Sequence, residues 1–297
     1  MMQFLVDSLL RAGDLMLVTL GLSTVYAMVR FPNMAQTEYA TIGAFVGLLL
    51  SGFGMPLWLC VVLSALVTGI VAVALHRFAF ARLLRSSPVI AMIGSLAVAM
   101  IIRSAIQAVA GTRSERFKLP IDVPHQFMGA VITTTQIVVL AVTALVVVAF
   151  LLLLFRTNLG RSMRAVAAQP DLARACGISS GRVVDIIGFL GGAFAAIGGA
   201  FLAIRSQGHF KLSPDLPPPG FAAGVVGGRR TPVGAIFGVL LLALVETLVT
   251  NLNFGPLVGE TFLYVPLAYG PAAGFCLLVV TLMFRPRGLF HSESKRV

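Results

Sequence analysis

Polar side chains occur at two places in a chain that is otherwise dominated by apolar residues. Asn33, Gln36 and Glu38 lie in a short break between two apolar runs, and Glu246 lies inside the apolar run 240–249. A charged side chain at the centre of a bilayer costs about 2.5–3.5 kcal/mol on insertion scales, so such groups usually face a water-filled cavity or a partner. The chemistry they offer is hydrogen bonding to a polar solute, or binding of a proton or an ion.

Each of these groups also has a structural interpretation. Glu246 either lines a pathway or holds a neighbouring helix by a hydrogen bond. Glu38, with Asn33 and Gln36, either contacts a solute or forms a polar cap at the membrane interface. Arg103, near the outer end of the apolar run 88–109, is expected to extend its guanidinium outward to water.

Other chemistry is not supported by the motifs of this sequence. A phosphate-binding loop of the GxxxxGK[ST] type needs a lysine preceded by glycine, whereas the three lysines follow Phe117, Phe210 and Ser294. The four histidines are dispersed without metal-ligand spacing, HExxH is absent, and three cysteines are too few for a disulfide framework. We therefore expect no catalytic activity, no metal and no cofactor bound by this chain.

The composition is that of a membrane protein. Hydrophobic residues make up 58% of the chain and charged residues 11%, against about 25% charged in soluble domains. No Asp, Glu, Lys or Arg occurs in 39–75, 123–155 or 261–284, and each stretch exceeds the roughly 20 residues that cross a bilayer as a helix. This excludes a soluble enzyme, a secreted disulfide scaffold and a disordered chain.

These apolar runs predict an all-α polytopic membrane protein with a single transmembrane domain over residues 1–297. The expected spans lie near 15–29, 39–56, 57–75, 88–109, 134–155, 186–204, 232–250 and 261–284. The glycines of the sixth span, at three- and four-residue spacings, are expected to serve helix packing.

Three basic connections predict the orientation. They lie at 77–85, 156–185 and in the tail 285–296, and Lys and Arg are retained on the cytoplasmic side during insertion. The net charge of +11 therefore indicates basic cytoplasmic loops beside membrane lipid rather than binding of nucleic acid. Three apolar runs separate the second connection from the tail, so one further crossing is required.

The segment 217–230 is the candidate for that crossing. Its uncharged part, about 12 residues or roughly 18 Å as a helix, is too short to cross alone. We expect a broken or re-entrant segment, with Arg229 and Arg230 in cytoplasmic water. Counting the spans backwards from Arg77 places the N-terminus outside. Gly227 and Gly228 are then candidates for the pathway lining.

The break at 30–38 has the same character in the first half of the chain. Two Gly- or Pro-interrupted segments, one in each half, indicate a pathway between the halves of a transporter. The alternative is that 30–38 forms a short cytoplasmic turn, with Arg30 at the interface.

The connection 156–185 is long for a membrane loop and contains a predicted short helix. Pro170 suits the first turn of a helix, and Gly177 suits its end, so residues 170–176 are expected to be helical. This helix would present Leu172, Ala175 and Cys176 as an apolar surface beside the charge of Arg174. It either docks into a groove on a partner or folds onto its own bundle.

The sequence of this helix resembles the EAA loop of ABC importer permeases. That pattern is Glu-Ala-Ala, three residues, Gly, nine residues, Ile; here Asp171 stands for the Glu, and Ala173, Gly177 and Ile187 fall at matching positions.

Further segments resemble more narrowly the LivH-type permeases of branched-chain amino-acid transporters. They are residues 33–38, 159–166, the glycines from Gly227 onward with Glu246, and the tail 285–290. The resemblance extends over nearly the whole chain.

The resemblance implies the architecture of an ABC importer permease, with 156–185 as the cytoplasmic coupling loop. The residues implied in coupling to an ATPase are Arg164, Ala165, Asp171, Ala173, Arg174 and Gly177. Those implied for the translocation pathway are Asn33, Gln36, Glu38, Gly227, Gly228 and Glu246.

The implied partners are a second homologous permease chain, two ABC ATPase subunits that use ATP, and a periplasmic substrate-binding protein, all at the bacterial cytoplasmic membrane. Branched-chain amino acids are the first expected substrates, with urea, short amides and aromatic compounds left open. An ion-gradient-driven secondary transporter is the alternative, and it would account for the carboxylates but not for the loop.

Overall fold

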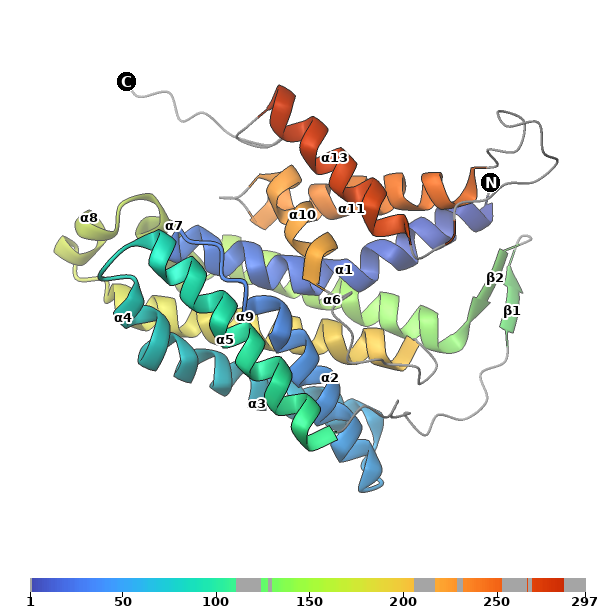
Figure 1. Ribbon diagram of the computed structural model, residues 1–297, viewed down its shortest axis with the longest axis horizontal. Coiled ribbons are helices and arrows are strands. Elements are labelled where there is room, and N and C mark those ends of the chain that lie inside the picture. Colours follow the sequence, from blue (N-terminus) through green and yellow to red (C-terminus); the bar gives the residue numbers. More distant parts are fainter. Residues whose placement is uncertain are drawn as a thin grey trace.

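The computed structural model of the protein describes residues 2–110, 124–127, 130–205, 217–228, 232–252, 266 and 269–285. In this part of the chain the architecture is a helical bundle with one small β-hairpin (Figure 1). The long helices are α1 Met2–Val29, α3 Leu57–Leu75, α5 Pro88–Ala110, α6 Thr134–Arg156, α9 Ser180–Arg205 and α11 Pro232–Asn251. Shorter apolar helices are α2 Gln36–Gly52, α10 Pro217–Gly227 and α13 Gly270–Phe284.

The remaining elements lie at the two ends of the bundle. At one end are α4 Ala81–Leu83, α7 Asn158–Ala168, α8 Pro170–Ala175 and a π-helical turn, η1 His76–Phe80, which continues α3. At the other end, strands β1 Pro124–Phe127 and β2 Ala130–Thr133 pair antiparallel, with Pro124 opposite Thr133.

All eight predicted spans contain a helix, so the prediction of a polytopic all-α protein is confirmed. Among the described residues, six helices are long and apolar enough to cross a membrane. The first span is longer than predicted, because α1 begins at Met2 and carries Arg11 and Asp14 within its first half. The hairpin was not predicted, and Arg229, Arg230, the outer loop 111–123 and the tail beyond Arg285 lie outside the described residues.

Contacts between distant segments identify the two ends. The side chain of Gln3, at the start of α1, accepts a hydrogen bond from the Val131 N–H of the hairpin at 2.9 Å. Arg30, just after α1, contacts the last residues of α7. The elements and connections at the α7–α8 end are rich in arginine: Arg77, Arg82, Arg85, Arg156, Arg161, Arg164, Arg174 and Arg182. By the positive-inside rule we therefore expect this end to face the cytoplasm and the start of α1 to face outward.

Helices α1 and α9 lie side by side and antiparallel at the centre of the bundle. Helices α2 and α3 pack on α9, and α10 and α11 pack on α1 (Figure 1). Helix α5 packs against α2 as α13 packs against α10 and α11. The sets α1–α2–α3–α5 and α9–α10–α11–α13 thus make corresponding contacts in opposite directions across the membrane, the arrangement of an inverted repeat.

Glycines bring α9 into backbone contact with its neighbours. A Cβ on Gly199 would lie 1.9 Å from the Ala40 carbonyl oxygen of α2, and a Cβ on Gly191 would lie 2.6 Å from the Val25 side chain of α1. The prediction that this glycine series serves packing is confirmed for these positions. Gly188 differs, because nothing lies within 4 Å of a Cβ added there.

Candidate functional site

The α7–α8 loop is fixed by local hydrogen bonds at each of its helix ends. The Thr157 hydroxyl accepts a hydrogen bond from Gly160 N–H at 3.1 Å and caps α7. Pro170 occupies the first turn of α8, and Gly177 has φ 81°, as predicted. Gly177 N–H donates to Arg174 O and Ile178 N–H to Ala173 O, both at 3.0 Å, which is the Schellman pattern. The loop is therefore a pair of short helices with defined ends.

One face of this loop packs on the bundle, and the other is exposed. Met163, Val166 and Ala173 are buried in a core shared with α1, α6 and α9. Leu172 is 59% exposed, and Asp171 and Arg174 form an exposed ion pair beside it. The inner face therefore folds onto the chain's own bundle, and docking on a partner stays a prediction for the exposed face.

The predicted coupling residues divide between these faces. Asp171, Arg174 and Gly177 are exposed, whereas Ala173 is buried and Ala165 is half-buried against the bundle. Arg164 donates to the Leu154 carbonyl at the end of α6 and covers the Phe155 ring at 5.6 Å. Of the six, Ala173, Ala165 and Arg164 thus contact their own chain, and a role of the set in coupling to an ATPase stays a prediction.

The segment between α1 and α2 is a buried break rather than an exposed turn. Phe31, Asn33 and Gln36 are 1%, 5% and 1% exposed. The Asn33 side-chain oxygen accepts from Ala35 N–H at 3.1 Å, and Gln36 Nε2 donates to the Gly191 carbonyl of α9 at 2.8 Å. Since Gly191 lies 11 residues along α9, roughly 17 Å from its start, α2 begins inside the bundle.

Helix α10 begins inside the bundle from the opposite direction. The Thr19 hydroxyl, midway along α1, donates to the Gly220 carbonyl at 3.3 Å. At the other end of α10, a Cβ on Gly227 would lie 2.0 Å from Gly234 O, and Gly228 has φ 117°. Gly227 therefore packs directly on the backbone at the start of α11, and a role of Gly227 and Gly228 in lining a pathway stays a prediction.

Glu38 and Arg103 form an ion pair between α2 and α5. Glu38 is 2% exposed, and the Arg103 side chain retains 32% exposure. The prediction that Arg103 points outward to water is wrong, because a buried carboxylate on the neighbouring helix attracts the guanidinium.

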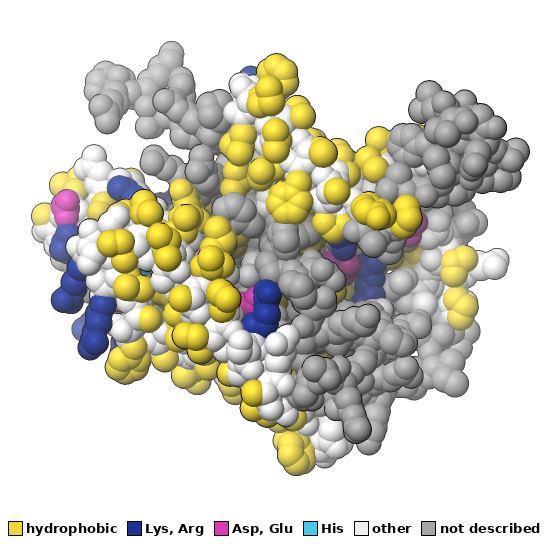
Figure 2. Space-filling model, in the orientation of Figure 1, with side chains coloured by type: hydrophobic (Ala, Val, Ile, Leu, Met, Phe, Trp, Pro, Cys, Tyr) yellow, Lys and Arg dark blue, Asp and Glu magenta, His cyan; other side chains and the backbone are white. Residues whose placement is uncertain are grey.

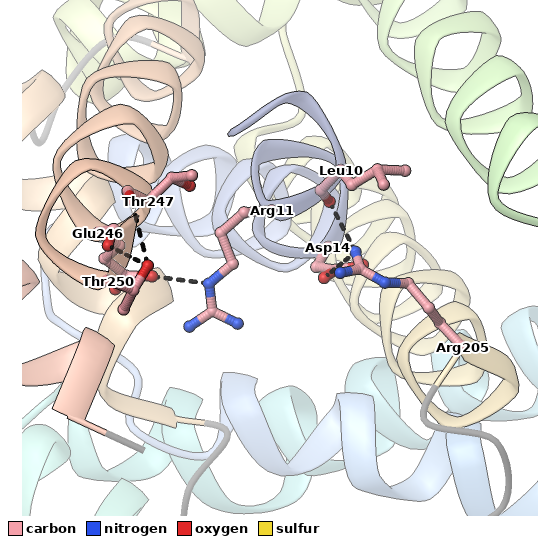
Figure 3. Close-up of polar contacts among 7 residues, drawn as sticks. All are labelled: Leu10, Arg11, Asp14, Arg205, Glu246, Thr247 and Thr250. Atoms are coloured by element: carbon pink, nitrogen blue, oxygen red, sulfur yellow. Dashed lines mark hydrogen bonds and ion pairs between the residues drawn. The ribbon is translucent and has the colours of Figure 1, made fainter. Parts of the chain in front are cut away.

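Glu246 is held in the same way by an arginine of α1. Arg11 Nε donates to Glu246 Oε2 at 2.7 Å, while Glu246 Oε1 has no partner among the described residues and faces Gly274 of α13 (Figure 3). The structure therefore supports the helix-holding interpretation of Glu246.

A third ion pair, between Asp14 and Arg205, joins α1 to α9 one helical turn from the second. Arg205 also donates to the Leu10 carbonyl at 3.0 Å (Figure 3). Sequence reasoning missed Arg11, Asp14 and Arg205. The signal available was the i, i+3 spacing of Arg11 and Asp14 directly before an apolar run, which places both on one helix face.

The three arginines share a pattern of exposure that indicates an aqueous or protein neighbour. The side chains of Arg11, Arg103 and Arg205 are 33%, 32% and 29% exposed, whereas their carboxylate partners are nearly buried. Figure 2 shows acidic and basic side chains grouped midway across the face that carries α5 and α13. Charges at membrane depth avoid lipid, so we expect this face to be turned toward water or another chain.

Comparisons with known proteins agree with this architecture. The family described as "Branched-chain amino acid transport system / permease component" matches residues 4–270. A probable branched-chain amino acid transport permease protein, LivH of Methanocaldococcus jannaschii, is 28% identical over 95% of this chain and 90% of its own length. The high-affinity branched-chain amino acid transport system permease protein BraD of Pseudomonas aeruginosa is 26% identical over 97% and 95% of the two chains.

The fold is also similar to that of a solved structure. A chain of PsaBC from Streptococcus pneumoniae, solved in complex with Fab, aligns with a TM-score of 0.51 over 96% of this chain and 92% of that chain. The sequences are 14% identical, so the likeness concerns the fold.

Proposed function

Because the chain belongs to the family of branched-chain amino acid transport permease components, we propose that it forms one half of the solute pathway of an ATP-driven importer. ATP is hydrolysed by two separate ABC ATPase subunits, since no lysine here lies in a phosphate-binding loop. A second homologous permease chain supplies the other half, and a periplasmic binding protein delivers the solute. The assembly acts in the bacterial cytoplasmic membrane.

The observation that carries this proposal is the two-faced α7–α8 loop at the cytoplasmic end. Its inner face is anchored to the bundle through Met163, Val166 and Ala173, and its outer face presents Leu172 with the charges of Asp171 and Arg174. A short helix with one apolar, exposed face fits a groove on a partner protein. Movement of that partner would pass to the bundle as a rigid displacement, because both helices have fixed ends.

The proposed pathway lies on the face that carries Arg11, Arg103 and Arg205. Partial exposure of arginines at membrane depth favours a water-filled passage shared with the second permease chain. Gln36 and Glu38 are buried inside the bundle. Gln36 donates a hydrogen bond to the Gly191 carbonyl, and Glu38 forms an ion pair with Arg103. Their direct contact with a solute requires those bonds to open during the cycle.

Branched-chain amino acids are the proposed solutes. The support is that LivH and BraD, which this chain matches over nearly all of its length, are branched-chain amino acid transport permease proteins. Urea, short amides and aromatic compounds are the alternatives, and a panel of these solutes added as competitors for uptake distinguishes them.

An ion-gradient-driven transporter remains the second candidate because Glu38 and Glu246 are buried carboxylates. Each is already paired with an arginine of a neighbouring helix, however, and so holds two helices together. An ion-coupled site needs a carboxylate that is available to the ion. These pairs therefore favour the ATP-driven mechanism.

Affinity purification from detergent-solubilised membranes, followed by reconstitution in liposomes, tests the function. We expect two ATPase subunits per complex. We also expect uptake of a branched-chain amino acid that requires ATP on the side of the membrane where the ATPase subunits are bound. Uptake by the isolated chain along a proton gradient, without ATP, would contradict the proposal.

A further inference from the structure

The junction between α1 and α2 contains an unusual backbone conformation at Arg30. Helix α1 ends at Val29, and Arg30 has φ 59°. It is the one residue other than glycine with positive φ in the described part of the chain. The left-handed conformation costs a side-chain-bearing residue roughly 1–2 kcal/mol, and glycine is the usual solution at a helix end. Because an arginine occupies this position instead of a glycine, we expect its side chain to make contacts that glycine could not make.

That side chain reaches the end of α7. Arg30 Nη2 donates to the carbonyl oxygens of Ala167 at 3.0 Å and Ala168 at 3.1 Å. The last carbonyls of a helix lack helical partners and carry the negative end of its dipole, so a cation there is well matched. The chain turns into α8 two residues later, at Pro170. Arg30 therefore binds the chain at the junction between α7 and α8 by two hydrogen bonds.

On its other side, Arg30 is continuous with the buried break. Phe31 packs against Phe80, with ring centroids 6.0 Å apart, and is 1% exposed. Five residues after Phe31, Gln36 is bonded to α9 within the bundle, and Glu38 follows at the start of α2. The short covalent path from Arg30 to these residues has no exposed loop in which a displacement would be lost.

We propose that Arg30 is a positioning residue that joins the α7–α8 loop to the break before α2, so that movement of the loop is transmitted to Gln36 and Glu38. The inference rests on the proposed function, because it assigns to Arg30 a step in the coupling of ATP hydrolysis to solute movement. The side chain acts through the backbone of 31–36 and does not itself contact the solute.

Arg30→Gly is the informative substitution. Glycine adopts φ 59° without strain, so the backbone of the junction is kept while the side-chain link is removed. Arg30→Lys keeps a cation but replaces the guanidinium, which binds two carbonyl oxygens, by a single ammonium. Its coupling should lie between that of the wild type and that of Arg30→Gly. Arg85→Ala is the matched control, because it removes an exposed arginine at the same end of the bundle.

The measurement is the number of solute molecules imported per ATP hydrolysed, in liposomes that contain the complete complex with its binding protein. We expect Arg30→Gly to lower this ratio by about fivefold or more, within the usual range of coupling between sites, while ATP hydrolysis continues. Arg85→Ala should retain the wild-type ratio. A wild-type ratio for Arg30→Gly would overturn the inference, whereas absence of ATP-dependent import by the wild type would overturn the proposed function instead.

Hydrogen exchange on the same complexes separates transmission from stability. In the wild type, nucleotide binding should change the exchange of amides in both 158–176 and 31–38. In Arg30→Gly the change in 158–176 should remain and that in 31–38 should be lost. Equal changes in both segments would contradict the inference. If Arg30→Gly does not assemble, Arg30→Gln is held to the same two criteria.

Discussion

In the described part of the bundle, three arginine–carboxylate pairs with a buried carboxylate join neighbouring helices. In each pair the carboxylate is nearly buried, and the arginine keeps about a third of its surface exposed. The desolvation cost of each carboxylate is therefore offset locally, and the arginine retains solvent or a partner chain on its other side. These pairs hold α1 to α9 and α11, and α2 to α5.

Removing one member of a pair should be more damaging than removing the charge of both. Arg11→Met leaves the Glu246 carboxylate buried without its donor, at an expected cost of about 1–3 kcal/mol in stability. In the double variant Arg11→Met/Glu246→Gln the buried charge is absent, and most of this loss should be recovered. The apparent melting temperature of the purified protein in detergent measures both effects. Equal melting temperatures for the single variant and the wild type would show that the pair contributes nothing to stability.

The partners in these pairs could not be read from the sequence. Arg11 and Glu246 are 235 residues apart, and Asp14 and Arg205 are 191 apart. Helical periodicity places Arg11 and Asp14 on one face, but which helices lie against that face depends on the packing of the whole bundle. The prediction that Arg103 extends outward to water missed its partner Glu38 for the same reason.

The helices themselves were largely predictable, because an uninterrupted apolar run long enough to cross a bilayer leaves the backbone few alternatives to a helix. The α8 boundaries followed from Pro170 and Gly177, whose backbone preferences are local. The start of α1 was misplaced because Arg11 and Asp14 interrupt its apolar pattern, and only their distant partners allow the helix to continue. The role of 30–36 as a buried break likewise depended on a contact with Gly191.

Backbone contact between α9 and α2 predicts a contrast between two glycines of the same helix. Gly199→Ala would place a Cβ 1.9 Å from the Ala40 carbonyl, and the helices must separate, at an expected cost of about 1–3 kcal/mol or more. Gly188→Ala meets nothing within 4 Å and replaces glycine by the best helix former, so stability should be unchanged or higher by up to about 1 kcal/mol. Apparent melting temperatures compare the pair directly. A larger loss for Gly188→Ala than for Gly199→Ala would be inconsistent with this packing.

For the whole molecule, the orientation across the membrane can be tested with the chain's own cysteines. Cys176 is exposed at the end of α8, Cys60 is 1% exposed, and Cys276 lies exposed on the apolar helix α13. In a Cys276→Ser background, a membrane-impermeant maleimide should modify Cys176 in inside-out vesicles and not in right-side-out vesicles. Bound ATPase subunits should protect it. Cys176→Ser is the control for specificity, and modification from the outer face would contradict the assigned orientation.

The glycine contacts of α9 also determine where this protein is able to bend. Main chains that touch leave no side-chain layer to rearrange, so α1, α2 and α9 behave as one stiff body. Helices α10 and α11 form a second such body, because a Cβ on Gly238 would lie 2.2 Å from the Ala223 carbonyl. Between the two bodies, α1 meets α11 through ordinary side chains such as Leu15 and Leu242 and through the Arg11–Glu246 pair. We therefore expect relative rotation of these two bodies to take place at this seam, and substitutions that change the size of its side chains should alter turnover while the contacts within each body are kept.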